Sequence, residues 1–384
     1  MAKNICIFSD GTGQGGAVKS LRNTNVFRLY NASCGTNPER QVCFYDPGLG
    51  ARQGGAKAWT RWLYDTLSQA TGLGISQNIK DCYGSILEHY DPGDRIFLFG
   101  FSRGAYTVRS LGGVLKLCGI PQTGPNGVSP RESADVRNAL AEEAVEKVYK
   151  AYGATDEARQ RRIMLGAAYR SRYGSVRASP HFIGVWDTVR ALGLPGTSAL
   201  VGWRHAFHDA SLDPDVQYAR HALSIDENRE VFEPVIWDVT QHDLESGRVK
   251  QVWFAGVHSD VGGAYADDRK LGDLSLEWMI REATEIPNPL AVDLDRIDPA
   301  LKGDPLGLQH DETYKRVNLW RIGTREAYHG DPYVQYATID DPSVFDRLRA
   351  PSVRCVRGDG RYRPQALQGR LTEFFTEATN PRTA

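Results

Sequence analysis

The motif Gly100-Phe101-Ser102-Arg103-Gly104 contains the residues best suited to nucleophilic chemistry. It fits the pattern G-x-S-x-G and directly follows the apolar run 95–99, which has the character of a buried strand. A serine hydroxyl becomes a useful nucleophile when it is exposed, held still and placed beside a base. A tight turn between a strand and a helix presents the oxygen above the sheet, and flanking glycines make room for that turn. The motif therefore predicts that Ser102 is a catalytic nucleophile.

An acid and a base follow Ser102 in the order that α/β-hydrolases use, which is serine, then carboxylate, then histidine. Asp187 ends the strand-like run HFIGVWD, and His258 follows the strand-like run QVWFAG. Both residues thus stand where parallel strands present their functional loops, at the carboxyl edge of the sheet. We predict that Asp187 and His258 complete a triad with Ser102.

Other residues compete for the two partner roles. Asp260 stands two residues after His258, and Asp226 in LSIDENR belongs to another loop. His310 in LQHDETY is the alternative base. Three further histidines, which we interpret as surface or packing residues in an excursion or in helix-like sequence, are His205, His208 and His221.

An oxyanion hole needs two backbone N–H groups, one from the residue after the nucleophile and one from a loop after an earlier strand. Arg103 supplies the first through its backbone. The segment SDGTG, residues 9–13, follows the first apolar run, and its glycines permit a close backbone approach. We therefore predict that Gly11 or Thr12 supplies the second donor.

Four aspartates raise the alternative of a hard cation, because each follows a strand-like run and they could meet at one edge. They are Asp10, Asp46, Asp187 and Asp260. No HExxH motif is present, and SDGTGQGG lacks both the G-K-[ST] ending of a P-loop and the spacing of a dinucleotide fingerprint. We predict a site without metal or cofactor, with a cation near Asp10 or Asp260 as the alternative.

The elements that position these residues alternate along the chain. Apolar runs with the length of buried strands cover residues 4–8, 41–45, 95–99, 181–186 and 251–255. Amphipathic, helix-like segments lie at 57–90 and 105–117. Strands that are apolar on both faces and alternate with helices indicate an α/β fold with a mostly parallel, doubly wound sheet.

We expect a single α/β-hydrolase domain over residues 1–384. Residues 122–178 interrupt the alternation with a Pro- and Gly-rich loop and two charged helices, and we interpret them as an inserted helical lid. Residues 192–209 mix Gly, Pro and aromatic residues and are expected to form a second, substrate-facing excursion. The last residues, 379–384, are expected to be a frayed tail.

Composition limits the partners. The 46 basic and 47 acidic residues leave a net charge of −1, so no global field favours nucleic acid or an anionic membrane. The first apolar run is too short for a signal peptide, and no run approaches the about 20 apolar residues of a membrane span. The six cysteines form no CxxC pair, which indicates free thiols in a reducing compartment.

A set of longer motifs is similar to one known family. In chain order they are DGT, NTNVFRLY, YDPGLG, GFSRGAYTVRSLGG, GVWDTV, HALSIDENREVFEP, VWFAGVHSDVGGAY and HDETY. Over roughly residues 3–315 the chain resembles an α/β-hydrolase-like family formerly of unknown function, which includes a class of type VI secretion lipase effectors. Where members often have DGTWN or DGTGN, this chain has DGTGQGG.

The resemblance implies a serine esterase with Ser102 as nucleophile, Asp187 as acid and His258 as base, and phospholipase A activity for the effector members. It also implies a lipid or ester substrate, a membrane surface, a secretion apparatus and an immunity protein as partners. The chain would then be cytoplasmic in the producing cell and delivered by a route that needs no signal peptide. Two alternatives are an esterase or thioesterase for a soluble substrate and a non-enzymatic binding module on the same fold.

Overall fold

The computed structural model describes residues 2–11, 23–35, 37–48, 73–153, 155–189, 212–297, 301–314, 322–325 and 337–367. Within this part of the chain, six parallel strands form one sheet in the order β2-β1-β3-β4-β5-β6. The strands are β1 (Asn4–Ser9), β2 (Gln41–Asp46), β3 (Arg95–Phe101), β4 (Phe182–Trp186), β5 (Tyr218–Ser224) and β6 (Val249–Phe254). The expected doubly wound, mostly parallel α/β fold is confirmed.

Alternate residues of the central strands face opposite sides of the sheet, because successive side chains of a strand point to opposite faces. In β1, Ile5 and Ile7 belong to one buried cluster, whereas Cys6 and Phe8 belong to another. The neighbouring strand β3 alternates in the same way. This alternation explains why both strands read as continuous apolar runs: each face has its own core.

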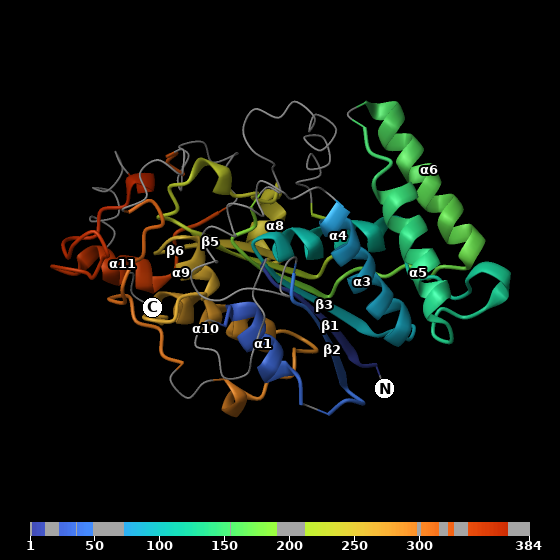
Figure 1. Cartoon of the computed structure of the whole chain (residues 1–384), viewed down its shortest axis with the longest axis horizontal. Coiled ribbons are helices and arrows are strands. Elements are labelled where there is room, and N and C mark those ends of the chain that lie inside the picture. The colour runs from blue at the N-terminus through green and yellow to red at the C-terminus, as the bar shows by residue number, and fades with distance from the viewer. Residues whose placement is uncertain are drawn as a thin grey trace.

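Helices cover both faces of the sheet. The helices α3 (Leu73–His89) and α4 (Arg103–Cys118) pack on one face, and α1 (Asn25–Ser33) and α10 (Lys270–Thr284) pack on the other, as Figure 1 shows. The shorter helices are α8 (Gln241–Glu245), α9 (His258–Gly262) and α11 (Pro342–Arg349). Short 3-10 turns lie at Pro125–Gly127, Glu230–Phe232, Leu294–Arg296 and Gln365–Leu367.

The sheet has a topological switch point between β1 and β3. The chain leaves β1 for β2 on one side and then returns to place β3 on the other side of β1. In open parallel sheets the crevice at such a point, outside the carboxyl ends of the strands, is where ligands bind. Gly11 follows β1 and Ser102 follows β3, so the predicted nucleophile stands at this crevice.

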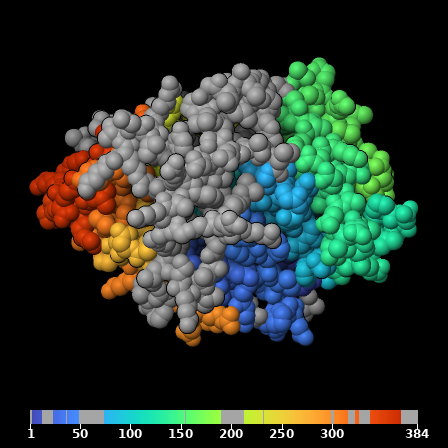
Figure 2. Space-filling view, in the orientation of Figure 1, coloured from blue at the N-terminus to red at the C-terminus, as the bar shows by residue number. Residues whose placement is uncertain are grey.

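The inserted segment between α4 and β4 consists of α5 (Ala134–Glu142), a π-helical stretch (Glu143–Tyr149) and α6 (Asp156–Tyr173). It forms one end of the molecule, opposite α11 (Figures 1 and 2). Leu140, Val145 and Tyr169 are buried in the same core cluster as α3 and α4. The Arg170 guanidinium donates to the Leu117 carbonyl near the C-terminal end of α4. The segment thus packs firmly against α3 and α4, and its function as a lid stays a prediction.

Several sequence expectations can be compared with the structure directly. All five expected strands are present, and β5 was missed. Residues 57–72 of the helix-like segment 57–90, the excursion 192–209 and the tail 379–384 lie outside the described residues, and the rest of the segment 57–90 contains α3. All six cysteines are free. In the described part, no helix combines the length and apolarity needed to cross a membrane.

Candidate active site

Ser102 occupies a strained turn between β3 and α4. Its φ and ψ are 57° and −118°, which is unusual for a residue with a side chain. A Cβ on Gly100 would lie 2.5 Å from the Gly104 carbonyl oxygen, and a Cβ on Gly104 would overlap the Ser9 carbonyl. The two glycines of the motif are therefore required by close backbone approaches, as expected for a nucleophile elbow.

The Ser102 hydroxyl is not used to hold the helix. Ser102 is the N-cap residue of α4, a position where serine commonly accepts a hydrogen bond from the first helical turn. Here the side chain makes no such bond. The backbone N–H of Ser102 donates to Trp186 O at 3.1 Å, which fixes the turn to the end of β4. The hydroxyl thus remains available, while its backbone is anchored beside Asp187.

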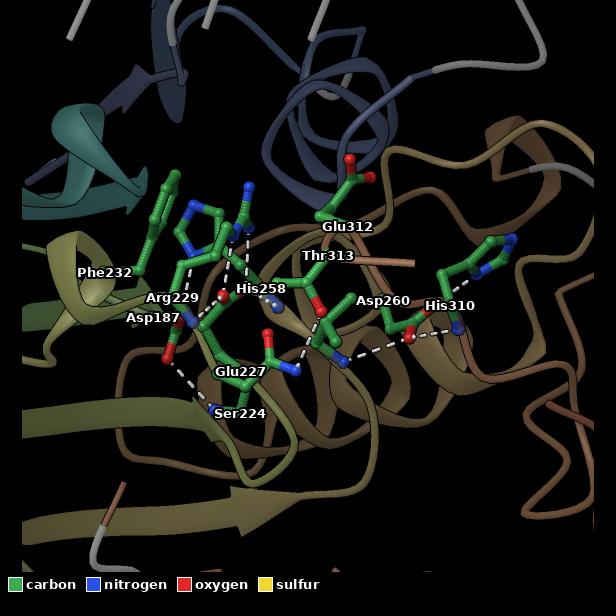
Figure 3. A network of polar contacts seen from close by, with 12 residues as sticks. Asp187, Ser224, Glu227, Arg229, Phe232, His258, Asp260, His310, Glu312 and Thr313 are labelled. Atoms are coloured by element: carbon green, nitrogen blue, oxygen red, sulfur yellow. Dashed lines mark hydrogen bonds and ion pairs between the residues drawn. The ribbon is translucent and has the colours of Figure 1, made fainter. Parts of the chain in front are cut away.

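Asp187 and His258 form a direct hydrogen bond at the carboxyl edge of the sheet (Figure 3). The distance from His258 Nδ1 to Asp187 Oδ2 is 2.6 Å, and both residues are buried. Asp187 has a positive φ of 39°, and its Oδ1 accepts from the Ser224 N–H at 3.0 Å. Because the carboxylate accepts from Nδ1, the other ring nitrogen, Nε2, is the one that can take a proton.

Arg325 neutralises the buried carboxylate of Asp187. Its Nη1 lies 2.6 Å from Oδ1 and its Nη2 lies 3.0 Å from Oδ2, a paired geometry that suits a guanidinium and a carboxylate. Arg325 also donates to the carbonyls of Ser224 and Phe232. Burial alone would raise the pKa of Asp187, but Arg325 and the hydrogen bond from His258 outweigh burial and hold that pKa below its usual value. Asp187 is therefore ionised at neutral pH.

His258 is held from several sides. Its backbone N–H donates to Glu227 Oε2 at 3.2 Å, and Glu227 in turn pairs with Arg229 at 2.7 Å. The rings of Phe101 and Phe232 lie 4.6 Å and 4.9 Å from the imidazole. Burial lowers the pKa of His258 despite the opposing effect of Asp187, so the imidazole is neutral at pH 7. A neutral, fixed imidazole suits a general base.

The structure gives no hydrogen bond between Ser102 and His258 among the residues it describes. Phe101 places the two close together, because it precedes Ser102 in the chain and its ring contacts the imidazole. Hydrogen bonds between nucleophile and base are often long in unliganded enzymes and shorten when substrate binds. Asp187 orients the His258 ring through Nδ1, and proton transfer from Ser102 to Nε2 stays a prediction.

The competing residues form a separate pair. His310 Nδ1 lies 2.6 Å from Asp260 Oδ1 (Figure 3). On the other side of the ring, His310 Nε2 lies 3.2 Å from Asp267. Asp260 also accepts from the Val257 N–H, where it caps the short helix that begins at His258. Asp260 and His310 thus brace the helix that carries His258, and neither contacts Asp187.

The remaining alternatives have structural partners or lie outside the described part. Asp226 accepts from the Gly256 N–H at 2.6 Å and from the Tyr362 hydroxyl at 2.8 Å. The expectation that His221 belongs to an excursion or to helix-like sequence is wrong, because it lies on β5, where Nε2 accepts from the Thr188 N–H. His205 and His208 lie outside the described residues.

The predicted oxyanion donors are only partly described. A Cβ on Gly11 would lie 3.5 Å from the Ser102 Cβ, so this backbone does approach the nucleophile. The Gly11 N–H, however, donates to Asp10 Oδ1 at 2.6 Å, so this hydrogen bond must break before the N–H can donate to a substrate oxygen. Thr12 lies outside the described residues. Arg103 begins α4, so its backbone N–H has no acceptor within the helix.

The aspartates considered for a cation are engaged with protein groups. Asp10 accepts from the hydroxyls of Thr24 and Tyr45, and Asp46 accepts from the Ser9 hydroxyl. Among the described residues, no group of three or more His, Cys, Asp or Glu side chains has the arrangement to hold a metal ion.

A cavity of about 370 Å³ borders the buried charged residues of the site. Glu227 and Arg325 form part of its wall, together with Arg357 and Arg363, but Ser102 and His258 do not. This cavity is therefore separate from the nucleophile.

Sequence reasoning missed the residues that surround the proposed acid and base. Glu227 and Arg229 lie within a motif that the resemblance had singled out, HALSIDENREVFEP, and their two-residue spacing is a usable signal for an ion pair. Arg325 lies 138 residues from Asp187 in the chain. No motif or spacing in the sequence connects these two residues.

Comparison with known proteins identifies relatives of this architecture. A family model described as the catalytic domain of Tle1-like type VI secretion phospholipase effectors matches residues 3–282. The uncharacterised Saccharomyces cerevisiae protein YEL023C is 25% identical over 242 residues, which are 60% of this chain and 32% of that protein.

Two solved structures are also similar. An uncharacterised Pseudomonas aeruginosa protein matches 78% of this chain and 48% of its own, with a TM-score of 0.43 and 16% identity. A Tle1 effector bound to the VgrG spike matches 69% of this chain and 51% of its own, with a TM-score of 0.31 and 18% identity. The chain thus spans about a third of the curated relative and about half of each solved chain.

Proposed function

The chain belongs to the family of Tle1-like phospholipase effectors of type VI secretion through its catalytic domain, and we propose that it is a serine hydrolase that cleaves the fatty acyl esters of phospholipids. The observation that supports this proposal best is the buried hydrogen bond of 2.6 Å between His258 and Asp187, beside a serine in an elbow conformation. Family membership supports the lipid substrate, and the geometry supports the chemistry.

In the proposed reaction, Ser102 Oγ attacks the carbonyl carbon of the ester while His258 Nε2 takes the hydroxyl proton. Asp187 remains ionised and stabilises the imidazolium. The imidazolium then gives its proton to the departing alcohol of the lysophospholipid, which leaves an acyl group on Ser102. Water attacks this acyl-enzyme with His258 again as base, and the fatty acid is released.

Backbone N–H groups would stabilise the oxyanion that forms at each step. The proposed donors are Arg103, at the positive end of the α4 dipole, and Gly11 or Thr12. The helix N-terminus favours negative charge at the place where the carbonyl oxygen becomes an oxyanion.

The test compares wild type with Ser102→Ala on a total lipid extract and identifies the products by mass. We expect fatty acid and lysophospholipid from wild type, and a loss of at least about 10³-fold for Ser102→Ala, because a triad without its nucleophile retains little catalysis. Ser246→Ala is the matched control, since Ser246 is exposed and donates to carbonyls of its own helix.

A fluorophosphonate probe gives an independent measurement, because it labels an activated serine. Labelling of the folded wild type that disappears in Ser102→Ala supports the proposal. Unchanged lipid hydrolysis by Ser102→Ala would rule the proposal out, and preference for short soluble esters over phospholipids would replace the lipid substrate with a soluble one.

We further propose that a type VI secretion apparatus delivers the chain to a target cell, with a component of that apparatus and an immunity protein as partners. Family membership supports this route. The test is co-purification of the tagged chain from a host that carries a type VI system. Recovery of a spike component supports the route, and its absence from cross-linked samples contradicts it.

A further inference from the structure

Arg103 differs from the other buried arginines of the described chain. Each of the other five has a carboxylate or carbonyl partner. The pairs are Arg28 with Asp273, Arg220 with Glu282, Arg229 with Glu227, Arg325 with Asp187, and Arg347 with the carbonyls of Pro305 and Gly307. Arg103 is only 6% exposed, and its Nη1 is buried without a hydrogen-bond partner. The described residues provide no ion pair or hydrogen bond to its guanidinium.

The carboxylates that follow the two strands beside β3 are already engaged. Asp10 accepts from Gly11, Thr24 and Tyr45, and Asp187 accepts from His258 and Arg325. Burial lowers the pKa of Arg103 to about 10, which still leaves the guanidinium charged at neutral pH. A buried charge without a partner is unfavourable, so its presence is best explained by a ligand that supplies the missing acceptor.

The position of Arg103 directs it toward the nucleophile. It is the first residue of α4, directly after Ser102. Side chains of an α-helix lean toward the helix N-terminus, so that of Arg103 extends toward the end where Ser102 stands. The first-turn N–H groups and the helix dipole add positive potential at the same end. Together these features favour an anion beside the serine.

We propose that the Arg103 guanidinium binds the phosphodiester of the phospholipid substrate while Ser102 attacks the neighbouring ester. This inference rests on the proposed function and specifies its substrate class. In a glycerophospholipid, the phosphate and the central ester are attached to adjacent glycerol carbons, so consecutive residues of one turn can contact both. The planar fork of a guanidinium matches two phosphate oxygens.

The experiment measures kcat/KM on two lipids with the same acyl chains in neutral detergent micelles. One is phosphatidylcholine, and the other is 1,2-diacylglycerol, which has the ester without the phosphate. For Arg103→Gln we expect the ratio of phosphatidylcholine to diacylglycerol turnover to fall by about 10- to 100-fold, the range for losing a charge-assisted hydrogen bond. Arg103→Lys should lose less, because it keeps the charge. Arg159→Gln, at an exposed position on α6, is the matched control.

Equal losses on both lipids would overturn the inference, because Arg103 would then act on the ester chemistry or on the fold. The thermal midpoint provides a second readout. Removing an unpaired buried charge should leave the midpoint of Arg103→Gln unchanged or raise it, and a large decrease would also contradict the inference.

A binding measurement separates this inference from the proposed function. Ser102→Ala is titrated with a non-hydrolysable diether phosphatidylcholine and with the matching diether glycerol, and the titrations are repeated with Arg103→Gln added. We expect the phosphate-bearing lipid to bind more tightly only when Arg103 is present. Hydrolysis of the ester phosphatidylcholine by Ser102→Ala would defeat the proposed function, whereas equal binding of the two diether lipids would defeat the role of Arg103.

Discussion

Arg325 is the residue that allows Asp187 to remain an anion in a fully buried position. Two nitrogens of the guanidinium face the two carboxylate oxygens at 2.6 Å and 3.0 Å. Asp187 uses the same oxygens to accept from His258 and from the Ser224 N–H. Arg325 therefore acts on the same carboxylate that accepts the hydrogen bond from His258, the proposed base, and orients its ring.

We predict that Arg325→Gln reduces both stability and activity. Removing one partner of a buried ion pair costs about 3–5 kcal/mol in the free energy of unfolding, because the other charge is left uncompensated. Denaturant titration measures this loss. Arg349→Gln is the control, since Arg349 forms a half-exposed pair with Asp346, and such pairs contribute about 0–1 kcal/mol.

The same variant should move the pH profile. A base must be unprotonated to act, and the lowered pKa of His258 places the acid limb of kcat/KM for wild type below pH 6.5. Without Arg325, the negative charge of Asp187 is no longer balanced and stabilises the imidazolium more strongly, so the limb should shift to higher pH. A limb that stays in place or moves to lower pH would contradict this electrostatic role.

At the scale of elements, the elbow depends on the absence of a side chain at Gly104. A Cβ there would overlap the Ser9 carbonyl at the end of β1. We predict that Gly104→Ala costs about 3 kcal/mol in the free energy of unfolding, because the obstacle is backbone and cannot rotate away. Activity should fall as well, since the same displacement moves the start of α4 away from its place beside Ser102.

Gly84→Ala is a matched control on the neighbouring helix α3. Nothing lies within 4 Å of a Cβ at Gly84, and alanine favours a helix interior over glycine by about 0.5–1 kcal/mol. Urea unfolding of both variants should therefore show opposite signs. If Gly104→Ala were as stable as wild type, the turn would have space for a Cβ, and the close approach to the Ser9 carbonyl would not be the reason for glycine at this position.

The difference between predicted and observed elements has a physical basis. Strands with continuous apolar runs were predictable because both faces of the sheet are covered by helices. β5 was missed because its sequence, YARHALS, contains Arg220 and His221. Arg220 is compensated by Glu282 and His221 by Gln251, and these partners lie 62 and 30 residues away in the chain. Such long-range compensation has no local signature.

The same distinction applies to the candidate site. Ser102, Asp187 and His258 could be proposed from the sequence because each stands at or shortly after the end of a recognisable strand and their order matches known chemistry. Arg325 could not, because it follows no such strand and its partner is distant. Gly11 was proposed from its place after the first apolar run and from the glycines around it, and neither feature reveals that the Asp10 carboxylate accepts the Gly11 N–H.

At the scale of the whole molecule, the charges of the chain nearly cancel. The net charge is −1, and many of the charged groups that the structure describes are paired with one another, as Arg220 is with Glu282. A membrane surface rich in anionic lipid attracts a protein by about 1 kcal/mol for each basic residue near the surface. The overall composition contains no excess of basic over acidic residues that would cause this attraction. The proposed positive site at Arg103 is buried and acts over a short range.

We therefore predict that hydrolysis by this chain depends little on the charge of the lipid surface. Initial rates on phosphatidylcholine vesicles should change by less than about threefold when a third of the lipid is replaced by phosphatidylglycerol, because the net field is weak. Raising the salt from 0.05 to about 0.5 M, which screens exposed charges beyond a few ångströms, should have an equally small effect. A rate that rises tenfold with anionic lipid and falls with salt would instead reveal a local basic surface. In that case phosphate recognition at Arg103 and attraction to the membrane would be separate electrostatic contributions, and the Arg103→Gln variant would retain the salt dependence.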